Sequence, residues 1–501
     1  MTVTRWKSDL VSNFDFVAGD WFGNAGSPYI PEALPFATGA ASGRANLEAD
    51  VDKTTGPSLT TILSFKGVDG AAPEGTLMTD AAGDLIGTTV VGGANDDGTV
   101  FEIAKTKHGY ASAPTVLASF AGYNGEQPAG SLIADGAGNI FSTTSGGGTY
   151  GYGTAFELAK MGKGYAAFPI ALVSFNGSDG ADPYGGLITD AAGNLFGTTT
   201  GEANQSDSTV FEIAKIKPSF AAAPTTLVTF TGTDGRLPIG SLITDAAGNL
   251  FGTTSVGGTD EAGTVFEIVK TNGVYANAPT TLVSFTGPDG AYPMGSLITD
   301  AAGDLFGTTS AGGADHGGTV FEIAKTDGGY ASVPTILVSF TGPGGFQPIG
   351  SLIADAAGNL FGTTALGGHG GNNGTVFEIA KTDGGYASAP TILLSFSGSD
   401  GAHPDGSLIA DAAGNLFGTT SGGGADDDGT VFEITNSGYV TQQPAATVTP
   451  SAAIAHSSPG SAAFVQAMAS HRADRFASGN PEIFASRNDT PALLSRPHAA
   501  Y

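Results

Sequence analysis

Short apolar runs recur along the chain, and clusters of Gly, Pro, Asn and Asp separate them. One stretch contains four such runs in a row: Ser296–Thr299, Asp304–Thr309, Thr319–Ala324 and Thr335–Thr341. Runs of this length that are rich in β-branched and aromatic residues and bounded by turn formers are typical of β-strands. The pattern therefore predicts four consecutive strands, joined by tight loops, within about 55 residues.

The same pattern is written seven times between about residue 60 and residue 439. A Phe-Glu pair marks each copy, at Phe101, Phe156, Phe211, Phe266, Phe321, Phe377 and Phe432, with spacings of 55 residues and one of 56. The extra residue falls most simply within Gly367–Gly374, which indicates a surface loop there.

Four antiparallel strands in this span are the size of a propeller blade, so we predict an all-β, seven-bladed β-propeller. The array begins with an outer strand near Thr60–Lys66 and ends after a third strand near Ile434. The N-terminal strand would then complete the last blade and close the ring without exposed sheet edges. The predicted domains are an N-terminal extension or cap over 1–59, the propeller over 60–440, and a low-complexity tail over 441–501 with a short helix at Ser461–Phe476.

The repeated motif Gly-x-Leu-Ile-x-Asp-Ala-Ala-Gly-Asn-Leu-Phe-Gly-Thr-Thr, followed by a Gly-Gly loop and Gly-Thr-Val-Phe-Glu-Ile, resembles the GloVer tandem repeat of bacterial "choice-of-anchor" proteins. The resemblance covers residues 60–439 and holds over some twenty positions in most copies. It implies a bacterial repeat protein that is exported or attached to the cell surface, with no established activity.

Composition narrows the classes of partner. With 47 acidic residues against 19 Lys and Arg, the 501-residue chain has a formal net charge of −28, so we expect no nucleic-acid partner. There is no Cys, which excludes disulfides and thiolate metal sites. No run of 18 apolar residues predicts a membrane span, and Met1–Gly19 lacks the apolar core of a cleavable signal peptide.

Several residue types recur in every copy, and a structural role explains them best. The aspartates that follow the first strand suit a tight turn. They are Asp80, Asp135, Asp190, Asp245, Asp300, Asp355 and Asp411. The mid-strand glutamates have lysines three residues later as candidate partners, and the turn aspartates are the alternative partners of those lysines. Aromatic residues after the third strand would fill gaps between blades, and glycines such as Gly87 in the second strand suggest a close approach of a neighbouring backbone.

Function is expected where blades differ. In a propeller, the loop that enters the innermost strand emerges on the same face as the loop between the second and third strands. The first loop has the form x-Pro-x-Gly, and its variable positions hold Glu74, Gln127, Asp182, Tyr184, Arg236, Tyr292, Met294, Phe346, Gln347, His403 and Asp405. From these we predict a ligand-binding set at the channel mouth: Asp182, Tyr184, Arg236, Tyr292, Phe346, His403 and Asp405.

The second loop is rich in carboxylates among glycines. Hard cations such as Ca²⁺ favour several oxygen ligands within reach, so these loops form a candidate metal site, with solvated loops as the alternative. The candidate ligands are Asp96, Asp97, Asp260, Glu261, Asp315, Asp426, Asp427 and Asp428. Calcium is the one cofactor that the sequence suggests.

Catalytic motifs are absent from the sequence. There is no His-Glu-x-x-His, Gly-x-Ser-x-Gly, Walker-type loop or dinucleotide fingerprint, and four of the seven histidines lie in separate repeats. We therefore expect a non-enzymatic, monomeric binding scaffold whose partner is a protein or a glycan on one propeller face. The alternatives are a carbohydrate-active propeller enzyme, either hydrolase or lyase, and a purely structural repeat protein.

The expected location is extracellular or at the cell surface, without a cleavable signal peptide. A type I export signal within residues 441–501 is the hypothesis for the route, and a cytoplasmic location stays open.

Overall fold

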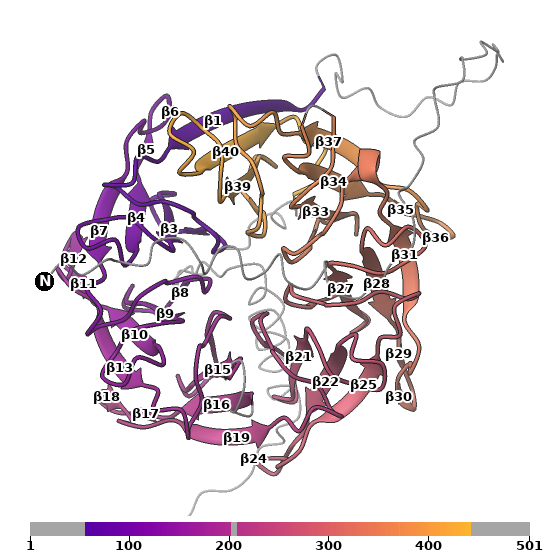
Figure 1. Cartoon of the computed structure of the whole chain (residues 1–501), viewed down its shortest axis with the longest axis horizontal. Coiled ribbons are helices and arrows are strands. Elements are labelled where there is room, and N and C mark those ends of the chain that lie inside the picture. Colours follow the sequence, from indigo (N-terminus) through magenta and orange to yellow (C-terminus); the bar gives the residue numbers. More distant parts are fainter. Residues whose placement is uncertain (1–55, 202–207, 370, 442–501) are drawn as a thin grey trace, which may run out of the picture. The chain divides into compact units, whose positions relative to one another are not determined.

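The computed structural model describes residues 56–201, 208–369 and 371–441. It contains seven four-stranded antiparallel sheets set around a common centre (Figure 1), which confirms the seven-bladed propeller. The predicted cap before residue 56, and the predicted tail after residue 441 with its helix at Ser461–Phe476, lie outside the described residues.

Each blade has the same four strands from the centre to the rim, and we number blades 1 to 7 in chain order. The innermost strands are β2 (Met78–Thr79), β8 (Ile133–Ala134), β14 (Ile188–Thr189), β20 (Ile243–Thr244), β26 (Ile298–Thr299), β32 (Ile353–Ala354) and β38 (Ile409–Ala410). The second strands are β3 (Leu85–Thr89), β9 (Ile140–Thr144), β15 (Leu195–Thr199), β21 (Leu250–Thr254), β27 (Leu305–Thr309), β33 (Leu360–Thr364) and β39 (Leu416–Thr420).

The outer half of each blade holds the two remaining strands. The third strands are β4 (Thr99–Ile103), β10 (Thr154–Leu158), β16 (Thr209–Ile213), β22 (Thr264–Ile268), β28 (Thr319–Ile323), β34 (Thr375–Ile379) and β40 (Thr430–Thr435). The rim strands are β7 (Thr115–Ser119), β13 (Ile170–Ser174), β19 (Thr225–Thr229), β25 (Thr280–Ser284), β31 (Thr335–Ser339), β37 (Thr391–Ser395) and β1 (Ser58–Ser64).

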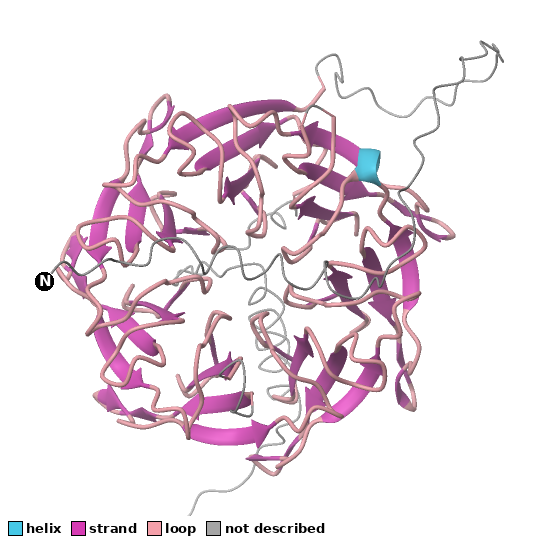
Figure 2. Cartoon of the chain, in the orientation of Figure 1, coloured by secondary structure: helices cyan, strands magenta, loops and turns pink. Residues whose placement is uncertain are grey.

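A small hairpin between the third and rim strands of blades 1 to 6 was not predicted, because its strands have only two residues each. The pairs are β5 (Lys105–Thr106) with β6 (Gly109–Tyr110), β11 (Lys160–Met161) with β12 (Gly164–Tyr165), β17 (Lys215–Ile216) with β18 (Ser219–Phe220), β23 (Lys270–Thr271) with β24 (Val274–Tyr275), β29 (Lys325–Thr326) with β30 (Gly329–Tyr330), and β35 (Lys381–Thr382) with β36 (Gly385–Tyr386). Among the described residues, the helical element is a 3₁₀ turn, η2 (Gly342–Gly344), which is cyan in Figure 2.

The N-terminal strand closes the ring as predicted. Strand β1 pairs antiparallel with β40, from Ser58 opposite Thr435 to Ser64 opposite Thr430. Blade 7 is therefore built from both ends of the repeat array, as the neighbouring indigo and yellow strands of Figure 1 show. Because β1 covers the edge that β40 would otherwise expose, blade 7 is completed like the others.

The hydrophobic core lies between blades. All five residues of every second strand are buried, because a blade packs on each face of it. A Phe that follows each rim strand meets the third-strand Phe of the next blade edge to face, as in Phe285 against Phe321. The seven pairs have ring centroids 4.9–5.1 Å apart, a favourable geometry for aromatic rings.

The repeated aromatic residue of the small hairpin also joins blades, as predicted. Tyr386 of blade 6 meets Phe306 of blade 5 edge to face at 5.7 Å, and the other blades repeat the contact where the second strand carries Phe. The hairpin lysine lies over the same ring, at 3.6–5.6 Å from the centroid. Each hairpin therefore acts as a plug inserted against the preceding blade.

The repeated aspartates have the turn-forming role predicted for them. In blade 5, Asp300 Oδ1 accepts the backbone N–H groups of Ala302 and Asp304. The corresponding Asp makes the same two hydrogen bonds in all seven blades. These bonds satisfy backbone donors that the tight turn would otherwise leave unpaired.

Two details of the structural interpretation were wrong. A Cβ on Gly252 would meet the Phe266 ring at 2.6 Å, so the second-strand glycine makes room for a side chain and not for a neighbouring backbone. For six of the seven repeated glutamates, the lysine that interacts electrostatically belongs to the next blade. Lys325 of blade 5, for example, lowers the pKa of Glu267 in blade 4, although burial raises that pKa overall.

The contact at Gly252 leads to a test. Gly252→Ala is expected to destabilise the fold by about 1–3 kcal/mol, because the added methyl overpacks against Phe266. Gly136→Ala is the matched control, since its Cβ would meet nothing within 4 Å and the other six copies have Ala there. Urea unfolding should show a lower midpoint for Gly252→Ala and an unchanged or higher one for Gly136→Ala. Equal midpoints would contradict the packing argument.

Candidate functional site

The two variable loops of each blade lie together on one face of the ring. Ala71, in the loop that enters the innermost strand, bridges to Val91, in the loop between the second and third strands. The same bridge joins the two loops at Arg236–Val256, Ala291–Ala311, Phe346–Leu366 and Ala402–Gly422. We call this side of the ring the axial face, and it is the face on which the ligand-binding residues were predicted.

One residue in each entering loop has a left-handed backbone, and it directly precedes Pro. These residues have φ between 51° and 58°: Ala72, Gln127, Asp182, Leu237, Tyr292, Gln347 and His403. In most blades the N–H of this residue donates to a loop carbonyl of the preceding blade, as His403 does to Asn373. Its own carbonyl accepts a hydrogen bond within the blade, as His403 does from Ser421.

This conformation is unfavourable for a residue with a side chain, and most of all for one that precedes Pro. Strained positions of this kind persist where surrounding contacts fix them, and they cluster at functional sites. The ring therefore holds seven side chains of six residue types in one fixed backbone geometry.

The residue between Pro and Gly in the same loops forms a second set, which we call the axial ring. Its members are half-buried: Glu74, Ala129, Tyr184, Ile239, Met294, Ile349 and Asp405. The Gly that follows each one lies against the next blade's loop, and a Cβ on Gly295 would meet the carbonyl oxygen of Gly350 at 2.9 Å. These glycines hold consecutive loops in backbone contact around the centre of the ring.

Closure of the ring brings two acids of the axial ring together. Blade 7 carries Asp405 and blade 1 carries Glu74, and burial raises the pKa of Glu74 to about 8, with a further contribution from the charge of Asp405. Burial also raises the pKa of Asp405 to about 6, against the opposing effects of Ser421 and His403. Ser421 Oγ donates to Asp405 Oδ2 at 2.6 Å.

Tyr184 of blade 3 is close enough to interact with both acids. Burial raises the pKa of its hydroxyl, and the charges of Glu74, Asp405 and Asp182 raise it further. The structure thus brings three predicted residues, Asp182, Tyr184 and Asp405, into one electrostatic group. Glu74 was among the variable positions but not in the predicted site, and its proximity to Asp405 follows from the closure of blade 7 against blade 1.

The remaining predicted ligand-binding residues are spread over the axial face. Arg236 pairs with Glu261 at 2.8 Å, and both side chains are more than half exposed, so the pair contributes little to stability. Phe346 and Tyr292 are half-buried in neighbouring blades, and His403 is exposed in blade 7. His403 Nδ1 lies 3.2 Å from the carbonyl oxygen of Ala365.

The carboxylates predicted to bind a metal are divided among separate loops. Asp96 and Asp427 accept N–H groups of their own loops, from Gly92 and Gly423, and Asp97 accepts the N–H of Gly122. Asp260, Asp315 and Asp426 are exposed. Burial raises the pKa of Asp428, with contributions from Asp426, Asp427 and Asp69. Within the described residues, no group of three or more His, Asp or Glu is placed to hold a metal ion.

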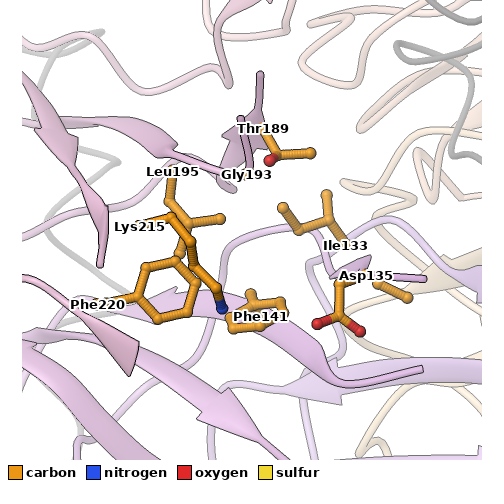
Figure 3. Close-up of a pocket in the computed structure, with 9 residues that line it drawn as sticks. Ile133, Asp135, Phe141, Thr189, Gly193, Leu195, Lys215 and Phe220 are labelled. Carbon is orange, nitrogen blue, oxygen red and sulfur yellow. The ribbon is translucent and has the colours of Figure 1, made fainter. Parts of the chain in front are cut away.

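Two features away from the axial face were missed by sequence reasoning. A small cavity of about 80 Å³ lies between blades 2 and 3, lined by Ile133, Phe141, Leu195, Lys215 and Phe220 among others (Figure 3). The second feature is a set of exposed apolar residues in blades 2 and 3: Met161, Phe168, Ile170 and Ile216. The cavity belongs to the packing of a hairpin plug, since Lys215 Nζ lies 3.6 Å from the centroid of Phe220.

The repeat can now be compared with known families. The family model of the Gloeobacter/Verrucomicrobia repeat matches residues 50–222, 172–336 and 330–455, which together span the whole propeller. The chain belongs to this repeat family. Membership confirms the resemblance found in the sequence. No curated protein matches the chain.

Solved structures with a similar arrangement are distant in sequence. A Thermus thermophilus protein described as an oxidoreductase (glucose dehydrogenase) is 13% identical, with 76% of this chain and 100% of that chain covered and a TM-score of 0.37. A protein of unknown function from Dyadobacter fermentans is 10% identical, with 76% and 100% covered and a TM-score of 0.38. An ulvan lyase is 11% identical, with 73% and 94% covered and a TM-score of 0.43.

The described residues include no candidate for a membrane span. Among residues 56–201, 208–369 and 371–441, no helix has the length and hydropathy needed to cross a bilayer.

The raised pKa of Glu74 predicts how stability changes with pH. The native state keeps a proton on Glu74 up to about pH 8, whereas the unfolded chain loses it near the ordinary value of 4.5. The native state therefore binds more protons in this window, and its free energy of unfolding falls as the pH rises. Glu74→Gln should remove this loss, so calorimetry at pH 5 to 8 should find its melting temperature increasingly above that of the wild type. Asp327→Asn, at an exposed hairpin position, is the control and should keep a constant difference.

Proposed function

We propose that this protein is a non-enzymatic binding scaffold, working outside the cell or at its surface, and that the axial face docks a protein or glycan partner. One observation carries the proposal. The backbone of the entering loops repeats in all seven blades, while the side chains held on it differ from blade to blade. A rigid frame that presents varied aromatic, amide and charged groups is suited to recognition.

The acid pair of the axial ring favours a second candidate, a carbohydrate-active hydrolase or lyase. At pH 7 a carboxyl with a pKa of about 8 is mostly protonated, and one with a pKa of about 6 is mostly ionised. Glycosidases commonly pair such an acid with such a carboxylate. The third candidate, a purely structural repeat protein, needs neither the pair nor the varied face.

The three candidates can be separated with one defined panel of oligosaccharides and oligopeptides. A binder is expected to show a ligand-dependent rise in melting temperature, because only ligands that bind the native state shift unfolding. A carbohydrate-active enzyme would also release products from the glycans, and a structural protein would show neither effect. Tyr292→Ala, Phe346→Ala and His403→Ala, combined, should abolish the shift.

The variants are designed to preserve the fold. Ala already occupies the corresponding positions in other blades, as Ala72 for Tyr292 and His403 and Ala71 for Phe346. The control combines Lys163→Ala, Asp327→Ala and Asp383→Ala, which change exposed hairpin residues outside the axial face. A thermal shift that survives the first triple variant would place the binding site elsewhere and overturn the proposal.

Calcium binding by the acidic loops is part of the proposal and has its own test. If Ca²⁺ holds the loop at Asp426, Asp427 and Asp428, excess Ca²⁺ should raise the melting temperature by several degrees, because a ligand of the native state stabilises it. A chelator should reverse the rise, and replacing the three aspartates with Asn should abolish it. Mg²⁺ at the same concentration controls for general screening. An unchanged melting temperature would mean that these carboxylates are solvated loop residues and do not bind Ca²⁺.

A further inference from the structure

We propose that the axial ring binds an alkylammonium group, either the side chain of an exposed lysine on a partner or a free aliphatic amine. The cation would lie with Glu74, Asp405 and Tyr184, and its carbon chain along Ile239, Met294 and Ile349. This inference rests on the proposed function, because it names the chemistry that the axial face would recognise.

The axial ring has two chemically distinct arcs. Chain order around the ring places Asp405 and Glu74 on adjacent blades 7 and 1, then the small Ala129 on blade 2 and Tyr184 on blade 3. Blades 4, 5 and 6 contribute only apolar side chains, Ile239, Met294 and Ile349. An alkylammonium group has the same division, with a charged head at one end and methylene groups along the rest.

The acids of the polar arc lack a matching cation. His403 lowers the pKa of Asp405, but burial outweighs it. Among the described residues no cation lowers the pKa of Glu74, which Asp405 raises further. Ionisation of the Glu74 carboxyl is therefore unfavourable in the free protein, and a bound cation would supply the counter-charge that favours it.

Blades 1 and 7, which carry the two acids, also differ from the other blades in the hydrogen bonding of a buried Thr. The second-to-last residue of each second strand is a buried Thr, and in blades 2 to 6 its hydroxyl donates to an entering-loop carbonyl of the next blade at 2.9–3.3 Å. In blades 1 and 7 the corresponding hydroxyls, those of Thr88 and Thr419, have no hydrogen-bond partner within the described residues, although each side chain is only 1% exposed.

The two unpaired hydroxyls lie directly behind the acids. Thr88 Oγ1 is 2.8 Å from the Cβ position of Gly75, which follows Glu74, and Thr419 Oγ1 is 2.8 Å from that of Gly406, which follows Asp405. The same Gly406 position is 3.0 Å from the carbonyl oxygen of Glu74, so Thr419 lies at the junction of the two acidic loops. A buried donor without a partner destabilises the fold. The polar arc therefore has two unpaired hydroxyl groups beside its two acids.

The charge of the whole chain favours the same ligand. A net charge of −28 attracts cations at long range and raises their rate of encounter with the surface. Neutral amines and anions gain nothing from this field. The two arcs of the axial ring, the unpaired hydroxyls and the negative charge of the chain therefore all favour an alkylammonium ligand.

Binding of a cation should be coupled to proton release. The titratable groups that interact here are Glu74, Asp405, His403, Tyr184 and Asp182. An ammonium beside Glu74 would lower the pKa of that carboxyl and expel its proton near pH 7. The affinity for the cation should then rise by about tenfold between pH 6 and pH 8, as expected for one coupled proton shifted by about one pKa unit.

The test is titration calorimetry of the full chain with N-acetyl-lysine methylamide and with hexylamine. N-acetyl-norleucine methylamide and hexanol are neutral controls with the same apolar stem. We expect the two amines to bind at least tenfold more tightly than the controls. Repeating the titration at pH 7 in buffers of different ionisation enthalpy should reveal proton release on binding. Equal binding of amine and neutral control would overturn the inference.

Variants locate the site. Glu74→Gln and Asp405→Asn should each weaken amine binding about tenfold, and Glu74→Gln should abolish proton release. Met294→Ala should weaken hexylamine more than methylamine, since each buried methylene contributes about fourfold in affinity. Asp327→Asn, at an exposed hairpin position outside the axial face, is the matched control and should change nothing.

Failure of this inference can be told apart from failure of the proposed function. If a panel ligand binds the axial face and the amines do not, the scaffold stands and the alkylammonium site is wrong. If amine binding persists in Glu74→Gln and Asp405→Asn, the amines bind elsewhere and the inference fails. If neither amines nor panel ligands bind, both fail.

Discussion

Backbone contact between consecutive entering loops is the constraint on which the rest of the structure depends. Each loop lies against the next with only a glycine between them, and a Cβ at that glycine would come within about 3 Å of the neighbouring loop. Seven sheets can close around one centre only because this contact is made without side chains. The residue before the glycine is thereby held facing the same centre in every blade, whatever its chemistry.

This constraint explains which features of the fold could be predicted from the sequence and which could not. The spacing of Phe101 and its equivalents indicates seven copies, and the unpaired first and last strands indicate that β1 completes blade 7. Both follow from local patterns, and the structure confirms both. The hairpin at Lys105–Tyr110 could not be predicted, because two-residue strands have no periodicity.

The candidate site is less accessible to sequence reasoning, because it depends on which blades are neighbours. Glu74 and Asp405 are separated by most of the chain, and only closure of the ring makes them interact. The sequence shows both as variable positions of the same loop, which is why Asp405 and Tyr184 could be predicted as site residues. The unpaired hydroxyls of Thr88 and Thr419 leave no sequence signal, since the same Thr is bonded in the other blades.

The hairpin plug and the ring it meets always belong to different blades, as Tyr330 of blade 5 and Phe251 of blade 4 illustrate. A blade is therefore a unit of sequence but not a self-contained unit of packing. Genetic exchange between two copies, with its crossover anywhere in the 55-residue period, would remove or add one plug and one receiving ring together. The number of blades in such a family can thus change by whole repeats while every junction stays matched, and only the size of the closed ring limits which numbers survive.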